Sequence, residues 1–122
     1  MKISKIKDSI YDCDITIVFD CDRQEFHRWL EKKYKTVKLD DYFTIGEHIN
    51  ITNPNTWHRH YLWFSKSDFT IKVYGAVMHE VFHCAMDCFA EVGLKINKKT
   101  NEAFAYYQEF IFESVLRILL KK

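Results

Sequence analysis

The sequence predicts an α+β domain: a small β-sheet with one N-terminal helix, followed by two long helices. Short β-branched runs in the N-terminal half predict the strands, and one charged amphipathic stretch among them predicts the first helix. Two long segments with apolar residues at helical spacing fill the C-terminal half. At 122 residues, the chain fits a single domain spanning 1–122.

The first strand and helix have clear signals. The run DITIVF at 14–19 is short and β-branched, which predicts a strand. The segment 22–34 places Phe26, Trp29 and Leu30 at helical spacing and offers Asp22 as an N-cap. We therefore expect an amphipathic helix with a charged outer face.

The middle of the chain has weaker signals. Segments 42–45 and 48–52 each read as a short strand, and 53–55 (Asn-Pro-Asn) predicts a turn. The aromatic run 57–65 is extended in character and predicts another strand.

The first long helix is expected to begin at a cap formed by Ser67 or Asp68 and to run to about Val92. Gly93 stands where a glycine in the left-handed conformation would end it. Its residues are apolar nearly all the way round, which predicts a helix buried in the centre of the domain.

Charge and cysteine content indicate which partners and which cellular compartment to expect. Eighteen basic and 17 acidic residues give a formal charge of +1, so neither nucleic acid nor an anionic membrane is an expected partner. No signal peptide or membrane span is apparent, and we expect a cytoplasmic protein. In a reducing compartment the four cysteines are expected to be free thiols, with a disulfide or a metal site as alternatives.

The sequence HEVFH at 79–83 carries the clearest chemical signal. On a helix, His79 and His83 differ by roughly 40° and rise roughly 6 Å, so their imidazoles can converge on one ion. Neutral imidazole is a good ligand for zinc. Glu80 lies beside the pair, where a carboxylate can take a proton from a water activated by the metal.

A catalytic zinc site needs a third protein ligand and an open position for water. A second long helix, expected over 101–120 after a Thr100 cap, carries Glu102 in its first turn. If this helix packs back on the first, Glu102 is brought toward the histidine pair. Asp87 is an alternative third ligand, because it lies one turn beyond His83 on the same face.

The motif HEVFH, followed by NEAFAY at 101–106, resembles the gluzincin metallopeptidases. These carry HExxH on an active-site helix and a glutamate ligand, often in an Asn-Glu pair, on the following helix. The resemblance covers residues 68–121 and is closest in spacing to the thermolysin-like group. The short chain is also similar to minimal gluzincins and to small phage and bacterial HExxH proteins.

This resemblance implies a zincin-like fold with Zn²⁺ held by His79, His83 and Glu102. It also implies that Glu80 acts as general base and acid. The aromatic strand 57–65 would then border the cleft.

The sequence departs from the thermolysin-like pattern at Tyr106, where an aspartate usually supports a histidine ligand. Tyr106 is our candidate to stabilise the oxyanion. Tyr107 and a histidine from the 58–60 segment are alternatives. His58 and His60 should point to the same side of a strand, as a surface pair or a second metal site.

The expected function is that of a zinc-dependent metallopeptidase, a hydrolase whose partner is a peptide or protein substrate. In that mechanism Glu80 takes a proton from water and later gives it to the leaving amine. An extended substrate would lie along the strand at the cleft edge. Alternatives are a non-catalytic, zinc-stabilised binding or structural module, such as a phage virion or host-interaction protein, and a metal-free helical interaction protein.

Overall fold

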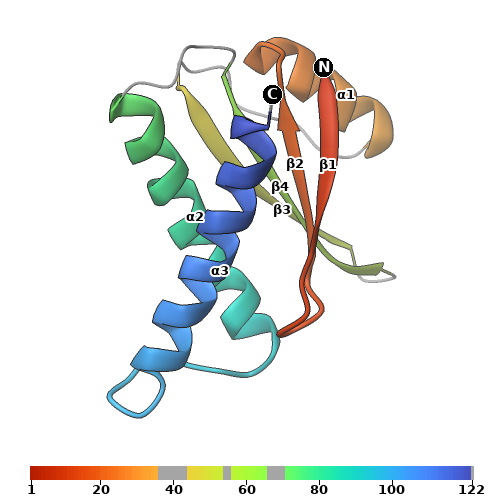
Figure 1. Cartoon of the computed structure of the whole chain (residues 1–122). Helices are drawn as coiled ribbons and strands as arrows, with labels where there is room; N and C mark the ends of the chain where they lie inside the picture. The colour runs from red at the N-terminus through yellow and green to blue at the C-terminus, as the bar shows by residue number, and fades with distance from the viewer. Residues whose placement is uncertain (36–43, 54–55, 66–70, 122) are drawn as a thin grey trace.

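The computed structural model describes residues 1–35, 44–53, 56–65 and 71–121. Four strands form one sheet in the order β1-β2-β4-β3, and three helices pack on it (Figure 1). In chain order the elements are β1 (Lys2–Lys7), β2 (Asp14–Phe19), α1 (Arg23–Lys33), β3 (Gly46–Asn53), β4 (Thr56–Phe64), α2 (Ile71–Glu91) and α3 (Asn101–Leu120).

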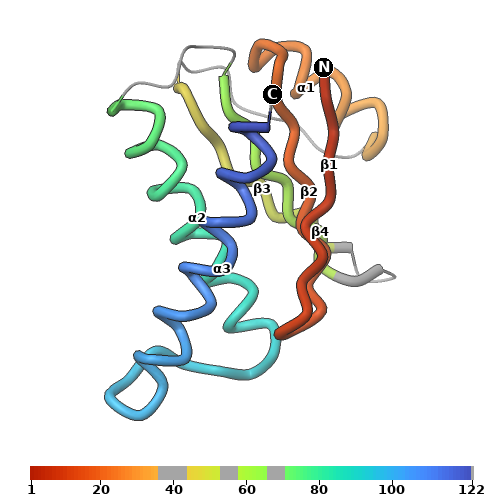
Figure 2. Tube along the Cα trace, viewed as in Figure 1, coloured from red at the N-terminus to blue at the C-terminus, as the bar shows by residue number. Residues whose placement is uncertain are grey.

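The sheet separates two apolar cores, so that α1 covers one face and α2 with α3 covers the other (Figure 2). Side chains alternate along each strand between these cores. Within β4, Leu62 and Phe64 join the α2 and α3 side, whereas Tyr61 and Trp63 join the α1 side. Strands β2 and β4 are parallel, and the two outer pairings are antiparallel.

The mixed α+β class is confirmed, but the order of elements differs from the expectation, because an additional strand, β1, comes first and α1 follows the second strand instead of the first. The connection through α1 between β2 and the later strands allows β2 and β4 to lie parallel. Strand β1 was not predicted, because KISKIK is rich in lysine and its two isoleucines are three residues apart, which is not the period of two that indicates a strand. Strand β3 is one continuous element over Gly46–Asn53, and residues 42–43 and 54–55 of the predicted strand and turn lie outside the described residues.

The residues predicted to begin α1 and to end α2 are confirmed in these places. Asp22 caps α1 by accepting a hydrogen bond from the Glu25 N–H at 2.8 Å. Gly93 has a φ of +80° and follows α2, with the Leu94 N–H donating to the Phe89 carbonyl at 3.0 Å. Ser67 and Asp68, the expected caps of α2, lie outside the described residues.

Helix α2 is not buried on all sides, contrary to the sequence prediction. One side packs on the sheet and another on α3, but a third side is exposed. Met78 is 55 % exposed, and Phe82 and Met86 are also exposed. Within the described part of the chain, no helix is long and apolar enough to cross a membrane.

Helix α3 begins without a side-chain cap from Thr100, which corrects the predicted cap. The Thr100 hydroxyl instead accepts a hydrogen bond from the Asn97 N–H at 2.9 Å. The Asn97 side chain accepts from the N–H groups of Lys99 and Thr100, so it organises the turn before the helix.

Asp8 ties the loop after β1 to α3. Its carboxylate accepts hydrogen bonds from the backbone of Ile10, Tyr11 and Cys13, and from the Tyr107 hydroxyl at 2.7 Å. Burial opposes ionisation of Asp8, but these hydrogen bonds outweigh it and lower the pKa of the carboxyl. The ionised Asp8 carboxylate therefore stabilises the folded protein at pH values above the ordinary carboxyl pKa. This stabilisation is lost as the pH falls below that value.

Substitutions of two adjacent tyrosines test the hydrogen bond between Tyr107 and Asp8. Tyr107 is 1 % exposed and donates to a buried carboxylate, whereas Tyr106 is 66 % exposed. We expect Tyr107→Phe to lower the free energy of unfolding by about 2 kcal/mol, because it removes a hydrogen bond to a charged group. Urea denaturation of Tyr106→Phe, the matched control, should match wild type. Equal effects of the two substitutions would contradict the assignment.

Candidate metal and hydrolytic site

The two histidines of the HEVFH motif lie on the exposed side of α2. Both side chains are solvent-accessible, and their Nε2 atoms lie 3.2 Å apart. The expectation that this helix is buried in the centre of the domain therefore does not hold for His79 and His83, and neither histidine belongs to the core.

The spacing of these nitrogens fits a shared ion. Two imidazole nitrogens on one tetrahedral zinc are about 3.3 Å apart, given a Zn–N bond of about 2.05 Å. The rings of His79 and His83 lie at 76° to each other with centroids 4.8 Å apart, so the helix alone brings both donors together. The pair provides two ligands of the right chemical type for zinc.

Glu80 turns away from solvent toward strand β3. Burial raises the pKa of its carboxyl above the ordinary value, and Glu47 adds to this effect. The nearby imidazoles of His79 and His83 and a hydrogen bond from the His48 backbone N–H oppose the rise. A carboxyl with a raised pKa next to a potential metal pair is suited to receive and return a proton.

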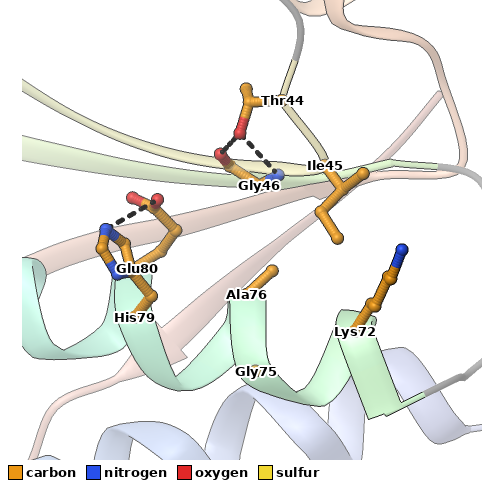
Figure 3. A pocket seen from close by; sticks show the side chains of 8 residues that line it. All are labelled: Thr44, Ile45, Gly46, Lys72, Gly75, Ala76, His79 and Glu80. Atoms are coloured by element: carbon orange, nitrogen blue, oxygen red, sulfur yellow. Dashed lines mark hydrogen bonds and ion pairs between the residues drawn. The ribbon is translucent and has the colours of Figure 1, made fainter.

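A cleft opens between the start of β3 and the N-terminal half of α2 (Figure 3). Its volume is about 390 Å³, and His79 and Glu80 lie at one end of it, with Lys72 at the other. Gly46 and Gly75 line it, and nothing lies within 4 Å of the place that a Cβ at Gly75 would take. A Cβ at Gly46 would instead meet the Phe64 ring at 3.1 Å, so this glycine allows the close contact between β3 and Phe64. A ligand in this cleft would reach Glu80 directly.

Strand β3 is the edge of the sheet on the side of this cleft. The Ser65 N–H donates to the Ile45 carbonyl at 2.9 Å, and the antiparallel alternation then directs the backbone groups of Gly46, His48 and Asn50 away from β4. The predicted cleft-border strand is therefore corrected. Strand β4, which contains most of the aromatic run, lies inside the sheet between β2 and β3.

The structure does not gather Glu102 into a three-ligand group with the histidine pair. Among the described residues, the groups of three His, Cys, Asp or Glu ligand atoms within 4.8 Å of one another do not include it. Glu102 is exposed in the first turn of α3. The Phe104 ring, two residues later, packs edge-to-face on Phe82 at 5.8 Å, so this turn lies beside the motif. Tyr106 is exposed on the same helix.

The other residues considered at the site have different partners. Asp87 Oδ2 lies 3.9 Å from His48 Nδ1, on the sheet side of α2. The Tyr107 hydroxyl is engaged by Asp8, which removes it as an oxyanion donor.

A buried histidine network adjoins the motif, and sequence reasoning missed most of it. His48 Nε2 lies 3.0 Å from His60 Nδ1, and His60 Nε2 lies 2.6 Å from Glu91 Oε1. His58 Nδ1 is 3.4 Å from the same Glu91 oxygen, which confirms that the two histidines of the strand face one side. The side chain of His60 is 0 % exposed, so the expectation of a surface pair is wrong for His60.

Alternation along β3 and β4 was the available signal for this network. His48 and Asn50 on one strand, and His58 and His60 on the next, repeat with a period of two. Their meeting with Glu91 depends on strand pairing and on the docking of α2, which the local sequence does not specify. Burial lowers the pKa of both His48 and His60 to about 4, so both rings are neutral near pH 7.

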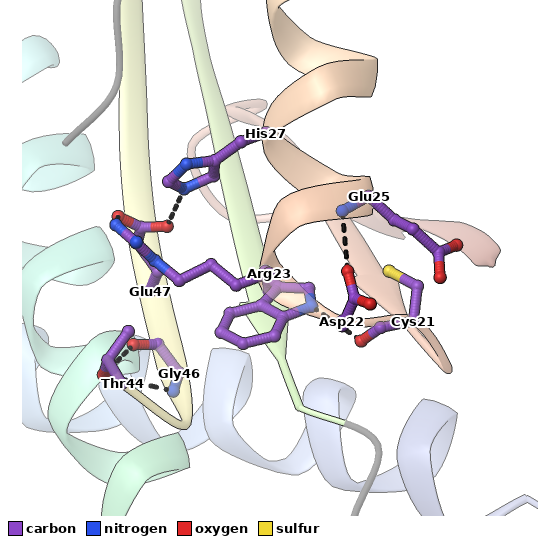
Figure 4. Close-up of polar contacts among 9 residues, drawn as sticks. Cys21, Asp22, Arg23, Glu25, His27, Thr44, Gly46 and Glu47 are labelled. Atoms are coloured by element: carbon purple, nitrogen blue, oxygen red, sulfur yellow. Dashed lines mark hydrogen bonds and ion pairs between the residues drawn. The ribbon is translucent and has the colours of Figure 1, made fainter. Parts of the chain in front are cut away.

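A second polar cluster lies on the opposite face of β3 (Figure 4). Glu47 accepts from Arg23 at 3.0 Å and lies 2.6 Å from His27 Nε2. Because Glu47 and His48 are consecutive on a strand, they face opposite layers. This cluster fastens α1 to the edge strand, and each charged group in it has an opposite partner.

None of the four cysteines forms a disulfide, in agreement with the expectation for a reducing compartment. Cys84 and Cys88 are fully buried on α2, and Cys21 is buried in the other core. Comparison of the chain with family models, with curated proteins and with solved structures finds no match.

Proposed function

We propose that this protein is a zinc-dependent hydrolase of peptide bonds, with its site at the HEVFH segment of α2. The observation that carries the proposal is the convergence of His79 and His83 at 3.2 Å beside a cleft that contains Glu80. The resemblance to gluzincins points to the same site. The geometry and the motif support the proposal.

In the proposed mechanism, His79 and His83 would hold the zinc. Zinc bound there would supply a Lewis acid that polarises the scissile carbonyl and makes a water more acidic. Glu80 takes a proton from that water as its oxygen attacks the carbonyl carbon, and it later gives the proton to the amine nitrogen as the C–N bond breaks. Burial favours the protonated form of Glu80, which helps it to hold the proton between the two steps.

Glu102 is proposed as the third ligand. Its position in the first turn of a helix packed against α2 supports this role, because the contact between Phe82 and Phe104 holds that turn close to His83. Its exposed side chain is free of core packing and can change rotamer. Tyr106 is proposed as the oxyanion donor on the same helix. Asp87 is the weaker candidate ligand, because its carboxylate lies toward His48.

The proposed substrate is an extended segment of a peptide or protein. The outward-facing backbone groups of Asn50 on the edge strand can pair with such a segment by strand addition. Those of Gly46 can do so if the segment displaces the Thr44 hydroxyl, which bonds the Gly46 carbonyl at 2.9 Å. The cleft runs along this edge and ends at Glu80. A bound strand would therefore pass the proposed general base.

A non-catalytic, zinc-stabilised binding module is the second candidate. The observation that favours it is the exposed apolar side of α2, where Met78, Phe82 and Met86 lie exposed near the histidine pair. Such a surface suits a protein partner. In this case the metal would stabilise the binding surface, and Glu80 would have no catalytic role.

Single substitutions of the motif histidines test the proposed site. We expect His79→Ala and His83→Ala each to abolish zinc-dependent hydrolysis of a fluorogenic peptide library. The free energy of unfolding in chelator should change by less than about 0.5 kcal/mol, because both side chains are exposed. His58→Ala, an exposed histidine outside the motif, is the matched control. Hydrolysis that survives in both motif variants would place the reaction elsewhere.

A further inference from the structure

A buried cluster between the sheet and α2 has the composition of a metal site. His48 from β3, His60 from β4 and Cys84 from α2 place one ligand atom each within 4.8 Å of one another. His60 and Cys84 are fully buried, and the side chain of His48 is 6 % exposed. This cluster shares no residue with the motif pair, whose two histidines are exposed, although His83 lies near enough to His48 to help lower its pKa.

We propose that His48, His60 and Cys84 bind a second divalent ion of the zinc class. Two imidazole nitrogens and a sulfur form a donor set that selects zinc and related borderline metals over calcium or magnesium. The distance of 3.0 Å between His48 Nε2 and His60 Nδ1 is close to the spacing of about 3.3 Å for two nitrogens on one zinc.

The contact to Glu91 prepares His60 as a ligand. Its Nε2–H donates to Glu91 Oε1 at 2.6 Å, which leaves the lone pair of Nδ1 directed at His48. A carboxylate on the far nitrogen of a ligating histidine fixes its tautomer and strengthens its donor nitrogen. Glu91 is itself held by the Asn50 amide at 3.4 Å and by His58.

Without a metal, one tautomer of His48 satisfies the contact with His60, because its Nε2–H can donate to the Nδ1 of His60 at 3.0 Å. The Nδ1 of His48 then lies 3.9 Å from the Asp87 carboxylate, which is too far for a hydrogen bond. A metal would replace the proton between the two rings, and the proton of His48 would move to Nδ1, on the side of Asp87. Nearby, the buried Asn50 Oδ1 has no hydrogen-bond partner among the residues that the structure describes.

A second group, Cys13, Cys88 and Glu91, also meets the distance criterion but is less suited to a metal. The contact with Cys88 and burial raise the pKa of the Cys13 thiol far above its ordinary range. A thiol must lose its proton to bind a metal, so this group is expected to remain metal-free.

An ion at the proposed site would fasten three elements together. It would join both strands of the β3–β4 hairpin to the middle of α2, directly behind the motif pair. The site is therefore structural, and it would hold the edge strand at a constant distance from Glu80. This inference does not require that the protein be an enzyme.

Cobalt substitution tests the proposal, because Co²⁺ bound to a thiolate gives a charge-transfer band in the near ultraviolet. Chelator-stripped full-length protein is titrated with Co²⁺ and followed by absorption. We expect a thiolate band in wild type that saturates at one ion per chain. The band should persist in the His79→Ala/His83→Ala double variant, whose loss of hydrolysis reports separately on the motif site.

Cysteine variants locate the ligand. Cys84→Ser should lose the band, whereas Cys21→Ser, a buried cysteine in the other core, should keep it. His48→Asn provides a second variant if Cys84→Ser does not fold, and it should weaken Co²⁺ binding at least tenfold. Absence of a thiolate band in wild type would overturn the proposal. Loss of the band in Cys88→Ser with retention in Cys84→Ser would also overturn it.

Discussion

Replacing Glu80 by glutamine is expected to reduce peptide hydrolysis by about 10²- to 10⁴-fold while zinc remains bound. The amide keeps the size of the side chain and removes its capacity to accept a proton. Zinc retention is expected because Glu80 points toward β3 and is not one of the proposed ligands. The measurement is the initial rate on a fluorogenic peptide library, with the zinc content of each sample determined in parallel.

Glu109→Gln is the matched control for this substitution. Glu109 is an exposed glutamate on α3, outside the cleft, and its replacement should leave the rate unchanged. If Glu80→Gln hydrolyses peptides as fast as wild type, Glu80 is not the general base. If wild-type protein loaded with zinc cleaves no peptide, the binding-module candidate takes precedence.

Acidification is expected to destabilise the metal-free protein between about pH 6.5 and pH 4. Burial lowers the pKa of His48 and His60 to about 4, below the ordinary histidine value of about 6.5. Between these pH values, the imidazoles of His48 and His60 bind protons in the unfolded chain but stay neutral in the folded protein. The free energy of unfolding therefore falls as the pH falls. A shift of this size for one histidine corresponds to about 3 kcal/mol. The pKa of the neighbouring Glu91 is raised by burial, so the folded protein binds that proton more readily and offsets part of this loss.

Urea denaturation in chelator at pH 7 and pH 4.5 measures this effect. His48→Asn should lose much of the pH dependence, whereas His58→Asn, whose side chain is half exposed, should keep it. The Asp8 carboxylate acts in a separate window at lower pH, because its pKa is lowered from an already acidic value. A free energy of unfolding that does not change between pH 7 and pH 4.5 would contradict the neutral, buried state of the two rings.

Local signals in the sequence predicted local structure well. The β-branched run at 14–19 is β2, and the Asp22 cap begins α1 where expected. Gly93 follows α2 in the conformation that its place after the helix predicted. In each case the signal and the structure lie within a few residues of each other, so no tertiary information was needed.

Features that depend on packing were harder to predict. The apolar composition of α2 indicated burial on all sides, but the elements in the described part of the chain cover two of them and leave Met78 and Phe82 exposed. The edge position of β3 follows from the strand order, which residue patterns do not encode.

In the candidate site, too, the local features were predictable and those that depend on packing were not. The pairing of His79 with His83 needs only one helical turn, and the sequence was sufficient to expect it. The approach of Glu102 depends on a helix-helix contact and on a side-chain rotamer, and it stays a prediction. The cluster of His48, His60 and Cys84 spans three elements, so it became visible only with the fold.

Zinc content by mass spectrometry tests the central claim most directly. Wild type and the His79→Ala/His83→Ala double variant are purified without added metal, incubated with zinc and dialysed. The proposed site predicts that the double variant holds one zinc fewer per chain than wild type, whether or not the buried cluster is also loaded. Equal zinc content in the two proteins would show that the HEVFH pair holds no metal, and would contradict the proposed function.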